Sequence, residues 1–308
     1  MNYFYGPVPS RRLGFSLGVD LTSPKVCSFE CIYCQLGATP HKTTRRFSAI
    51  DLGKLKKELR TILKRHPHID YITISGSGEP TLHKNLDKII SVIKKVGRNK
   101  YPVCVITNSS LLYRKDVRRE LKKADLIIPS LDAATPATFK RINRPHKSIN
   151  LNKIVKGLIA LRKEFKGKIW LEIMLLKGVN DSLKEAKKFK ELVREIKPDK
   201  IQLNLPIRPT AQKVSFPDKK RIGEIKKILG KNVEVATVLS KKTRKKFYPG
   251  AKHDIVKFLK RRPATIKDLA QSLRLHYNEV LKCIDMLIAD KKVREYRHEG
   301  RKYFIAND

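Results

Sequence analysis

The sequence predicts an α/β fold: an open barrel of strand–helix units followed by a small winged-helix domain. From about residue 50, amphipathic helical segments such as LGKLKKELRTILKR alternate with short apolar, β-branched segments such as YITIS. Repeated βα units imply a parallel sheet with right-handed crossovers. After residue 253 this alternation gives way to three short helical patterns and a predicted hairpin, which indicates a second domain.

Six strands are expected in the barrel, each followed by a helix, with the last helix near RIGEIKKIL. In chain order the strands are SLGVDL, YITIS, VCVIT, DLIIPSL, IWLEIML and KIQLNL. Six such units can curl into three-quarters of an eight-unit barrel, in which the carboxyl ends of the strands form the site. We therefore expect an α/β partial (β/α)6 barrel over residues 1–240.

A basic segment with a Pro-Gly break, SKKTRKKFYPGAKH, predicts a linker over residues 241–253. Phe247 and Tyr248 within it suit either a single strand of RNA or packing on the barrel. Residues 254–308 then read as three helices and a hairpin turning at Glu299-Gly300, which is a winged-helix arrangement with Leu273–His276 before the third helix. Such domains bind duplex nucleic acid or other proteins, and both readings stay open.

The chain carries a formal net charge of +40, with 69 Lys and Arg against 29 Asp and Glu. Adaptation to heat enriches glutamate alongside lysine, so a thermophilic origin alone does not explain the excess. A polyanion such as nucleic acid is the natural counterpart. Most of the excess lies outside residues 254–308, so the barrel surface would carry much of any such contact. The N-terminus lacks a signal-peptide pattern and no apolar segment is long enough to span a bilayer, which predicts a cytoplasmic protein without membrane contact.

Three of the five cysteines, Cys27, Cys31 and Cys34, lie in the segment CSFECIYC with the spacing C-x3-C-x2-C. Three thiolates from one short loop can bind a 4Fe–4S cluster and leave one iron free for a small molecule. Structural zinc, with His41 as the fourth ligand, is the alternative. Cys104 and Cys283 lie in apolar patterns and are expected to be core residues.

The segment SGSGEPT, Ser75–Thr81, follows the next strand and is expected at the same end of the barrel. Its glycines allow the backbone to approach a ligand, and the Glu79 carboxylate can accept hydrogen bonds from an ammonium group. Tyr33, directly before Cys34, can pack a ring against a planar ligand beside the cluster. Together these segments predict a site for a cluster and an amino-acid-like ligand.

The chain resembles the radical S-adenosylmethionine (SAM) superfamily from about Gly6 to the sixth strand. The resemblance is carried by CSFECIYC, GSGEPT, TNSS, SLDAATPATFKRINRP, LLKGVND and QLNLPIRP. Within that superfamily it resembles the group that opens with GPVPSRRLGxSLGVD, which is related to the wybutosine-synthesis (demethylwyosine synthase) enzymes acting on tRNA. Those enzymes carry further N-terminal cysteines for a second cluster. No cysteine precedes Cys27, so we do not expect their second cluster or their reaction here.

The resemblance implies that Cys27, Cys31 and Cys34 bind a 4Fe–4S cluster whose open iron chelates SAM. It also implies that an electron donor such as ferredoxin or flavodoxin reduces the cluster, and that SAM cleavage yields a 5′-deoxyadenosyl radical. The residues that would contact SAM are Tyr33 at the adenine, Gly76, Ser77, Gly78, Glu79 and Pro80 at the amino group, and Asn108, Ser130 and Asp132 at the ribose or carboxylate. Helix capping and turn formation are the alternative roles of the last three.

Residues expected to contact the substrate lie at the start of the chain and after the later strands. Arg11 and Arg12 suit a phosphate, with a solvated position as the alternative. Lys177, Asn180, Asn204 and Arg208 follow the fifth and sixth predicted strands, with loop stabilisation as the alternative.

We expect a radical SAM enzyme that modifies RNA, with tRNA favoured by the charge and the related group. An activase or peptide-modifying enzyme acting on a protein is a second hypothesis, and it would not require so general a positive surface. A non-catalytic iron–sulfur sensor that binds nucleic acid through the winged helix is a third, and it would not require the GSGEP loop. Substrate, product and oligomeric state are not predicted by the sequence.

Overall fold

The computed structural model describes residues 3–10, 12–22, 25–65, 69–236, 250–273, 275 and 277–307. The predictions for Arg11, Phe247 and Tyr248, and most of the predicted linker 241–253, concern residues outside these ranges. Within the described part of the chain, no helix combines the length and apolar character needed to cross a membrane.

The first unit is an eight-stranded sheet whose strands are hydrogen-bonded in chain order, β1 to β8. Strands β2 to β8 pair in parallel, and β1 is antiparallel to β2. The strands are β1 (Phe4–Ser10), β2 (Gly14–Val19), β3 (Tyr71–Ile74), β4 (Val103–Thr107), β5 (Leu126–Pro129), β6 (Lys168–Met174), β7 (Lys200–Asn204) and β8 (Val233–Val235). The predicted α/β fold with a mostly parallel, partial-barrel sheet is confirmed.

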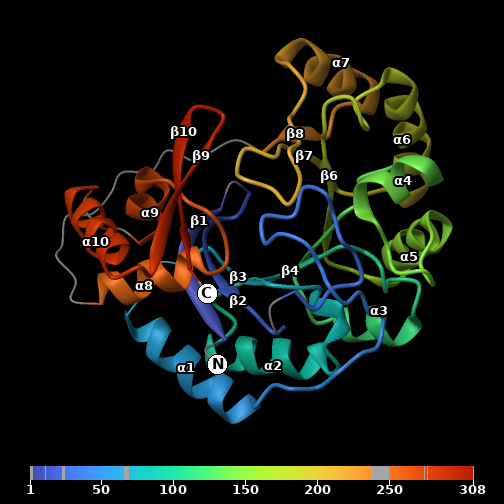
Figure 1. Cartoon of the computed structure of the whole chain (residues 1–308). Coiled ribbons are helices and arrows are strands. Elements are labelled where there is room, and N and C mark those ends of the chain that lie inside the picture. Colours follow the sequence, from blue (N-terminus) through green and yellow to red (C-terminus); the bar gives the residue numbers. More distant parts are fainter. Residues whose placement is uncertain are drawn as a thin grey trace.

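The helices of this unit cover the outer side of the sheet (Figure 1). They are α1 (Leu52–Arg65), α2 (Leu86–Val96), α3 (Lys115–Leu121), α4 (Pro136–Asn143), α5 (Leu151–Glu164), α6 (Leu183–Ile196) and α7 (Lys219–Leu229), with a short 3₁₀ turn η1 (Pro80–Leu82). Several begin at the side-chain caps that the sequence offers, such as Asn150 before α5 and Ser182 before α6, whose oxygens accept from backbone N–H groups of the first turn. Their buried faces and the strands form one continuous core.

Two strands of the sheet were not counted in the sequence-based prediction. Strand β1 contains Pro7 and Pro9, which argue against an interior strand, but it lies at the edge and its register with β2 shifts between Tyr5 and Val8. Proline is tolerated at such edges and bulges. Strand β8, within VEVATVL, has three residues and is the opposite edge.

The second unit consists of α8 (Ala251–Leu259), α9 (Ile266–Leu273), α10 (Tyr277–Ala289) and the hairpin β9 (Val293–His298) with β10 (Arg301–Ala306). This is the predicted order of elements, and the hairpin turns at Glu299 and Gly300, both with positive φ. The unit lies beside β1 (Figure 1), and Val8 of β1 belongs to its apolar core. The Tyr303 hydroxyl donates to the Ile207 carbonyl after β7, at 2.7 Å, so the unit contacts the barrel at two places.

Candidate active site

The three cysteines lie in a loop that leaves the carboxyl end of β2. Its apolar residues Phe29 and Ile32 are buried, whereas Cys27, Cys31 and Cys34 are partly exposed. Backbone N–H groups of Glu30 and Ile32 donate to carbonyls at the end of α4. The loop is therefore anchored by its intervening residues, and its thiols remain available to a ligand.

Each of the three thiols receives a hydrogen bond from an N–H donor. Lys25 Nζ lies 3.3 Å from Cys34 Sγ, Asn108 Nδ2 lies 3.5 Å from Cys27 Sγ, and Asn143 Nδ2 lies 3.4 Å from Cys31 Sγ. Burial, followed by the nearby Glu79 charge, raises the pKa of Cys27 to about 12, so this thiol is protonated at neutral pH in the protein alone. Binding of iron would displace that proton. The three donors would then stabilise negative charge on the sulfurs.

The donor set fits an iron–sulfur cluster better than a single zinc ion. Among the described residues, no group of three or more His, Cys, Asp or Glu side chains is arranged to hold one metal ion. The His41 side chain, proposed as a fourth zinc ligand, is exposed. A cluster instead requires three soft thiolates, each directed at a different iron atom.

Replacing Asn143 with valine should make the reduction potential of the reconstituted cluster more negative. The amide donates to Cys31 Sγ, and its positive end favours the reduced, more negatively charged cluster. Redox titration followed by electron paramagnetic resonance measures the shift. Asn150→Val, which removes the N-terminal cap of α5 on the outer side of the barrel, serves as the control, and equal potentials in both variants would contradict the prediction.

The loop after β3 brings Gly76, Ser77, Gly78, Glu79 and Pro80 alongside the cysteine loop. Gly76 has φ of +142°, and a Cβ there would overlap the carboxylate of Asp20; a Cβ at Gly78 would overlap the Val26 carbonyl oxygen. The backbone N–H and hydroxyl of Ser77 donate to Asp20. The glycines are thus required for close packing of the two loops, and Asp20, which the sequence analysis did not select, positions the turn.

Glu79 is buried, and its carboxylate is bonded to groups of the chain itself. Oε1 accepts from the Thr81 N–H at 2.9 Å and from the Thr81 and Thr107 hydroxyls at 2.6 Å, and Oε2 accepts from the Asn108 N–H at 2.7 Å. Burial raises the pKa of this carboxyl, while the donated hydrogen bonds oppose the shift. Because the Asn108 side chain also donates to Cys27, this one residue joins the GSGEP loop, through its backbone N–H, to the cysteine loop.

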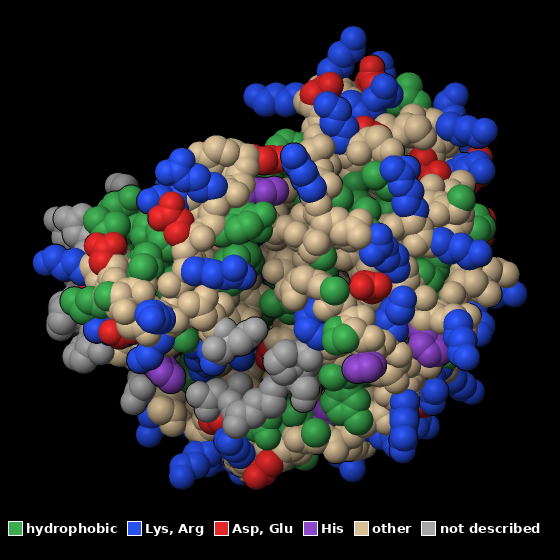
Figure 2. Space-filling view, viewed as in Figure 1, with side chains coloured by type: hydrophobic (Ala, Val, Ile, Leu, Met, Phe, Trp, Pro, Cys, Tyr) green, Lys and Arg blue, Asp and Glu red, His purple; other side chains and the backbone are tan. Residues whose placement is uncertain are grey.

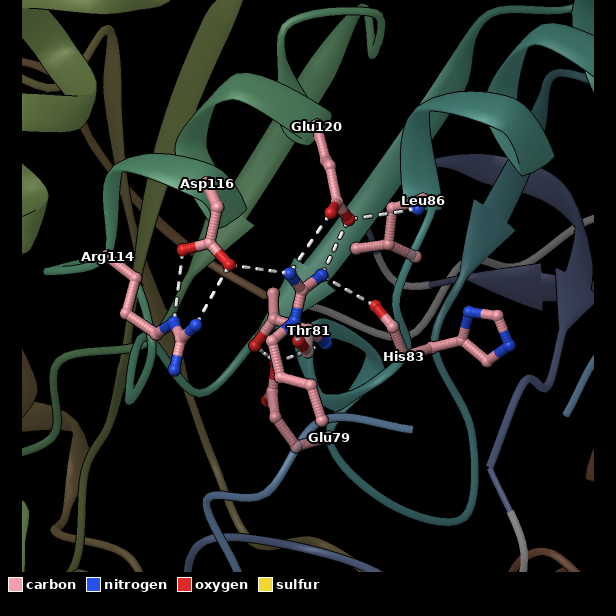
Figure 3. Close-up of polar contacts among 8 residues, drawn as sticks. Glu79, Thr81, His83, Leu86, Arg114, Asp116 and Glu120 are labelled. Atoms are coloured by element: carbon pink, nitrogen blue, oxygen red, sulfur yellow. Dashed lines mark hydrogen bonds and ion pairs between the residues drawn. The ribbon is translucent and has the colours of Figure 1, made fainter. Parts of the chain in front are cut away.

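Arg46 stabilises the same turn through contacts whose partners are labelled in Figure 3. Its Nε donates to the Thr81 carbonyl and its Nη2 to the His83 carbonyl, while Nη1 and Nη2 bind Glu120 of α3 and Nη1 also binds Asp116. All five N–H donors of the guanidinium are used in this way. The turn that follows Glu79 is therefore fixed to α3 by one buried arginine.

Asp132 and Tyr33 connect the cysteine loop to the far side of the site. The Tyr33 hydroxyl donates to Asp132 Oδ2 at 2.5 Å, Asn143 Nδ2 donates to the same oxygen, and the Met174 N–H donates to Oδ1. Burial raises the pKa of both Asp132 and Tyr33. Asp132 is thus a buried acceptor that orients Tyr33.

Two more predicted residues have local partners. The carbonyl of Ser130 accepts from the Ser109 hydroxyl. Asn180 is buried, and its amide bonds the backbone of Leu176, Asp132 and Met174. These contacts match the loop and turn roles that were the alternatives for both residues.

A cavity of about 350 Å³ lies inside the barrel next to the cysteine loop. Of the predicted site residues, the structure brings six together in its wall: Arg12, Tyr33, Cys34, Gly76, Asn204 and Arg208. Lys177 is exposed and is not among the lining residues. The cavity is thus continuous with both ligand loops and extends toward the residues expected to contact substrate.

Glu172 of β6 contacts two residues of the cavity wall, Arg12 and Asn204. It forms an ion pair with Arg12, and Asn204 Nδ2 donates to its Oε2 at 3.2 Å. Burial lowers the pKa of Arg12. Sequence analysis did not select Glu172, although a charged residue within the apolar segment IWLEIML was a usable signal.

Arg261 and Arg262 of the second unit also line the cavity. Arg261 Nε lies 3.4 Å from Asp20 Oδ2, the same carboxylate that accepts from Ser77. These arginines approach the barrel only because the second unit packs on β1. Nothing in the local sequence pattern indicated this placement.

The barrel, the three-thiol loop and the adjoining glycine loop define a radical SAM protein. Residues 22–189 match the family model described as the radical SAM superfamily. A radical SAM methyltransferase from Sphaerobacter thermophilus shares the fold, with a TM-score of 0.55 and 18% identity over 71% of this chain and 65% of that chain.

Relatives at higher identity narrow the assignment. The UPF0026 protein of Methanocaldococcus jannaschii is 33% identical over 100% of this chain and 97% of its own length, and the UPF0026 protein of Synechocystis is 40% identical over 67% and 76%. The chain belongs to the UPF0026 family of the radical SAM superfamily, and this membership implies a 4Fe–4S cluster and SAM as cofactors. A protein named GTPase Obg from Brachyspira hyodysenteriae is 41% identical over 98% of this chain, which spans only 45% of that protein.

Proposed function

We propose that this radical SAM enzyme modifies RNA, with tRNA as the preferred class. The observation that carries the proposal is the charge: a net +40 on the chain, and a cavity wall that holds four arginines, three of which are paired with carboxylates outside the lining residues. Figure 2 shows Lys and Arg side chains spread over both units on the face in view. A dual-specificity RNA methyltransferase, RlmN, from Thermotoga maritima is 24% identical over 67% of this chain and 59% of its own length, which supports the RNA class.

The cofactors, when bound, supply one-electron cleavage of the SAM sulfonium and hence abstraction of a hydrogen atom from the substrate. The chain's own residues bind and orient the cofactors and the substrate. Cys27, Cys31 and Cys34 would hold the cluster, and the backbone of Gly76–Gly78 would lie along SAM. Glu79 and Asp20 keep that loop in place through their hydrogen bonds.

The second unit is proposed to be a winged-helix domain that contacts nucleic acid through its hairpin and not through its third helix. Helix α10 exposes apolar side chains (Tyr277, Leu281, Met286 and Ile288) and contains one lysine against one aspartate and one glutamate. The strands of the hairpin instead carry four basic residues against one glutamate, Glu295, and an exposed Tyr296; the basic residues are Arg294, Arg297, Arg301 and Lys302. Basic and aromatic side chains on one surface suit a single strand.

The purified protein should bind tRNA with a steep dependence on salt. If about six or more phosphates are neutralised, affinity should fall about 10³-fold between 50 and 200 mM salt. Fluorescence anisotropy with labelled tRNA measures this. A flat dependence, or no binding at low salt, would contradict an RNA substrate.

Mass spectrometry of tRNA nucleosides from cells with and without the gene tests the modification itself. One nucleoside should be lost and its precursor should accumulate in the deletion strain. Restoration by the wild-type gene, but not by a Cys31→Ala gene, would assign the change to the cluster-dependent reaction. Identical nucleoside profiles, and identical profiles of ribosomal RNA, would refute the proposed function.

A further inference from the structure

Two consecutive arginines of the second unit are held rigidly in the cavity wall. The guanidinium carbon of Arg261 lies 4.7 Å from the centre of the Tyr5 ring, and that of Arg262 lies 4.6 Å from the centre of the Phe258 ring. Arg261 also bonds Asp20 and the Lys257 carbonyl. Stacking of this kind fixes a guanidinium before a ligand arrives, which lowers the entropy lost on binding.

A third arginine, Arg208, reaches the same cavity from the loop after β7. Its Nη2 lies 3.7 Å from Asp268 Oδ1 of α9, and its side chain is 12% exposed. Its Nε is buried and has no hydrogen-bond partner among the described residues. A buried N–H group without a hydrogen-bond acceptor lowers the stability of the folded protein. A ligand oxygen that accepted from this N–H would remove that cost.

Two of these arginines are paired with carboxylates that do not line the cavity. Asp20 and Asp268 lie outside the lining residues; Asp20 Oδ2 is 3.4 Å from Arg261 Nε, and Asp268 Oδ1 is 3.7 Å from Arg208 Nη2. A guanidinium has five N–H donors in a planar fork that matches phosphate oxygens. The wall therefore presents cationic donors and, among its described residues, no acidic side chain.

We infer that Arg208, Arg261 and Arg262 form a phosphate subsite, which binds a backbone phosphate of the nucleotide to be modified. This inference rests on the proposed RNA substrate and adds a role for the second unit, which becomes part of the active site. The carboxylate of SAM is the other anion that enters the cavity, and the experiment separates the two.

The test compares Arg262→Gln and Arg208→Gln with wild type and with Arg194→Gln, an exposed arginine on α6 that carries the same charge loss. The reconstituted full-length proteins, saturated with S-adenosylhomocysteine, are titrated anaerobically with random-sequence RNA trinucleotides. One set has phosphodiester linkages, and the other has uncharged methylphosphonate linkages. Affinity for S-adenosylhomocysteine is measured separately, and thermal unfolding verifies that each variant is folded.

The subsite predicts that Arg262→Gln and Arg208→Gln each weaken phosphodiester binding about tenfold, the loss expected for one charge-assisted hydrogen bond. Arg194→Gln should change the affinity for phosphodiester trinucleotides less than about twofold. None of the variants should change the affinity for methylphosphonate trinucleotides or for S-adenosylhomocysteine. Equal effects of Arg262→Gln and Arg194→Gln would overturn the inference. So would a parallel loss of S-adenosylhomocysteine affinity, which would assign these arginines to SAM. Either result leaves the tRNA nucleoside comparison untouched, so the two proposals fail separately.

Discussion

Replacing Cys31 with alanine should abolish SAM cleavage and greatly reduce the iron bound by the protein. Two thiolates cannot hold three corners of a 4Fe–4S cube, and the Asn143 amide that donates to Cys31 would lose its sulfur acceptor. Iron and sulfide analysis after anaerobic reconstitution measures the cluster. Chromatographic detection of 5′-deoxyadenosine after reduction measures cleavage, and we expect a loss of at least about 10³-fold, the scale on which removing an essential group acts.

Cys283→Ala is the matched control for this prediction. Cys283 is buried in α10, within the apolar core of the second unit, and Cys104 is buried in β4, as the sequence predicted for both. The Cys283→Ala protein should bind iron and cleave SAM like wild type, with a modest loss of stability. A Cys31→Ala protein that kept a full cluster would show that the assignment of the three ligands is wrong.

Replacing Arg46 with methionine should lower the free energy of unfolding by about 3–5 kcal/mol, the range for breaking a buried ion pair from one side. The change leaves Glu120 without its bidentate partner and frees the carbonyls of Thr81 and His83 (Figure 3). Because these carbonyls belong to the turn after Glu79, affinity for S-adenosylhomocysteine should fall as well. Denaturant unfolding and calorimetric titration measure the two effects.

Arg114→Met provides the comparison, because Arg114 binds the same Asp116 but is 40% exposed. Arg114→Met should lower the free energy of unfolding by no more than about 1 kcal/mol, as for other exposed ion pairs. The loss of unfolding free energy in Arg46→Lys should lie between those of Arg46→Met and Arg114→Met. Lysine keeps the charge but cannot reach both carbonyls and both carboxylates at once. If Arg46→Met and Arg114→Met were equally stable, the buried arginine would not be what fixes the turn.

Local sequence was sufficient to predict those features that depend on residues close together in the chain. The spacing of Cys27, Cys31 and Cys34, and the glycines of GSGEP, specify short loops, and the alternation of helical and apolar segments specifies the parallel sheet. Strand β1 was missed because proline normally excludes a strand, and only its position at the sheet edge allows it.

The residues that sequence analysis missed act across long chain separations. Arg46 lies 74 residues from Glu120, and Arg261 lies 241 residues from Asp20, so neither contact leaves a pattern in a short window. Glu79 illustrates the opposite case. Its motif was recognisable, but its four hydrogen bonds to Thr81, Thr107 and Asn108 follow from the packing of the loop after β3 against the end of β4 and could be read only from the structure.

In the described part of the chain the sheet is open, with β1 and β8 as its two unpaired margins. The second unit packs on β1 and also contacts the loop after β7, so it bridges the two edges of the open sheet. Among the described residues, its polar contacts with the barrel include Tyr303 with Ile207, Arg208 with Asp268 and Arg261 with Asp20. Because the same unit contacts both margins of the open sheet, its position relative to the barrel determines how far apart these margins stand.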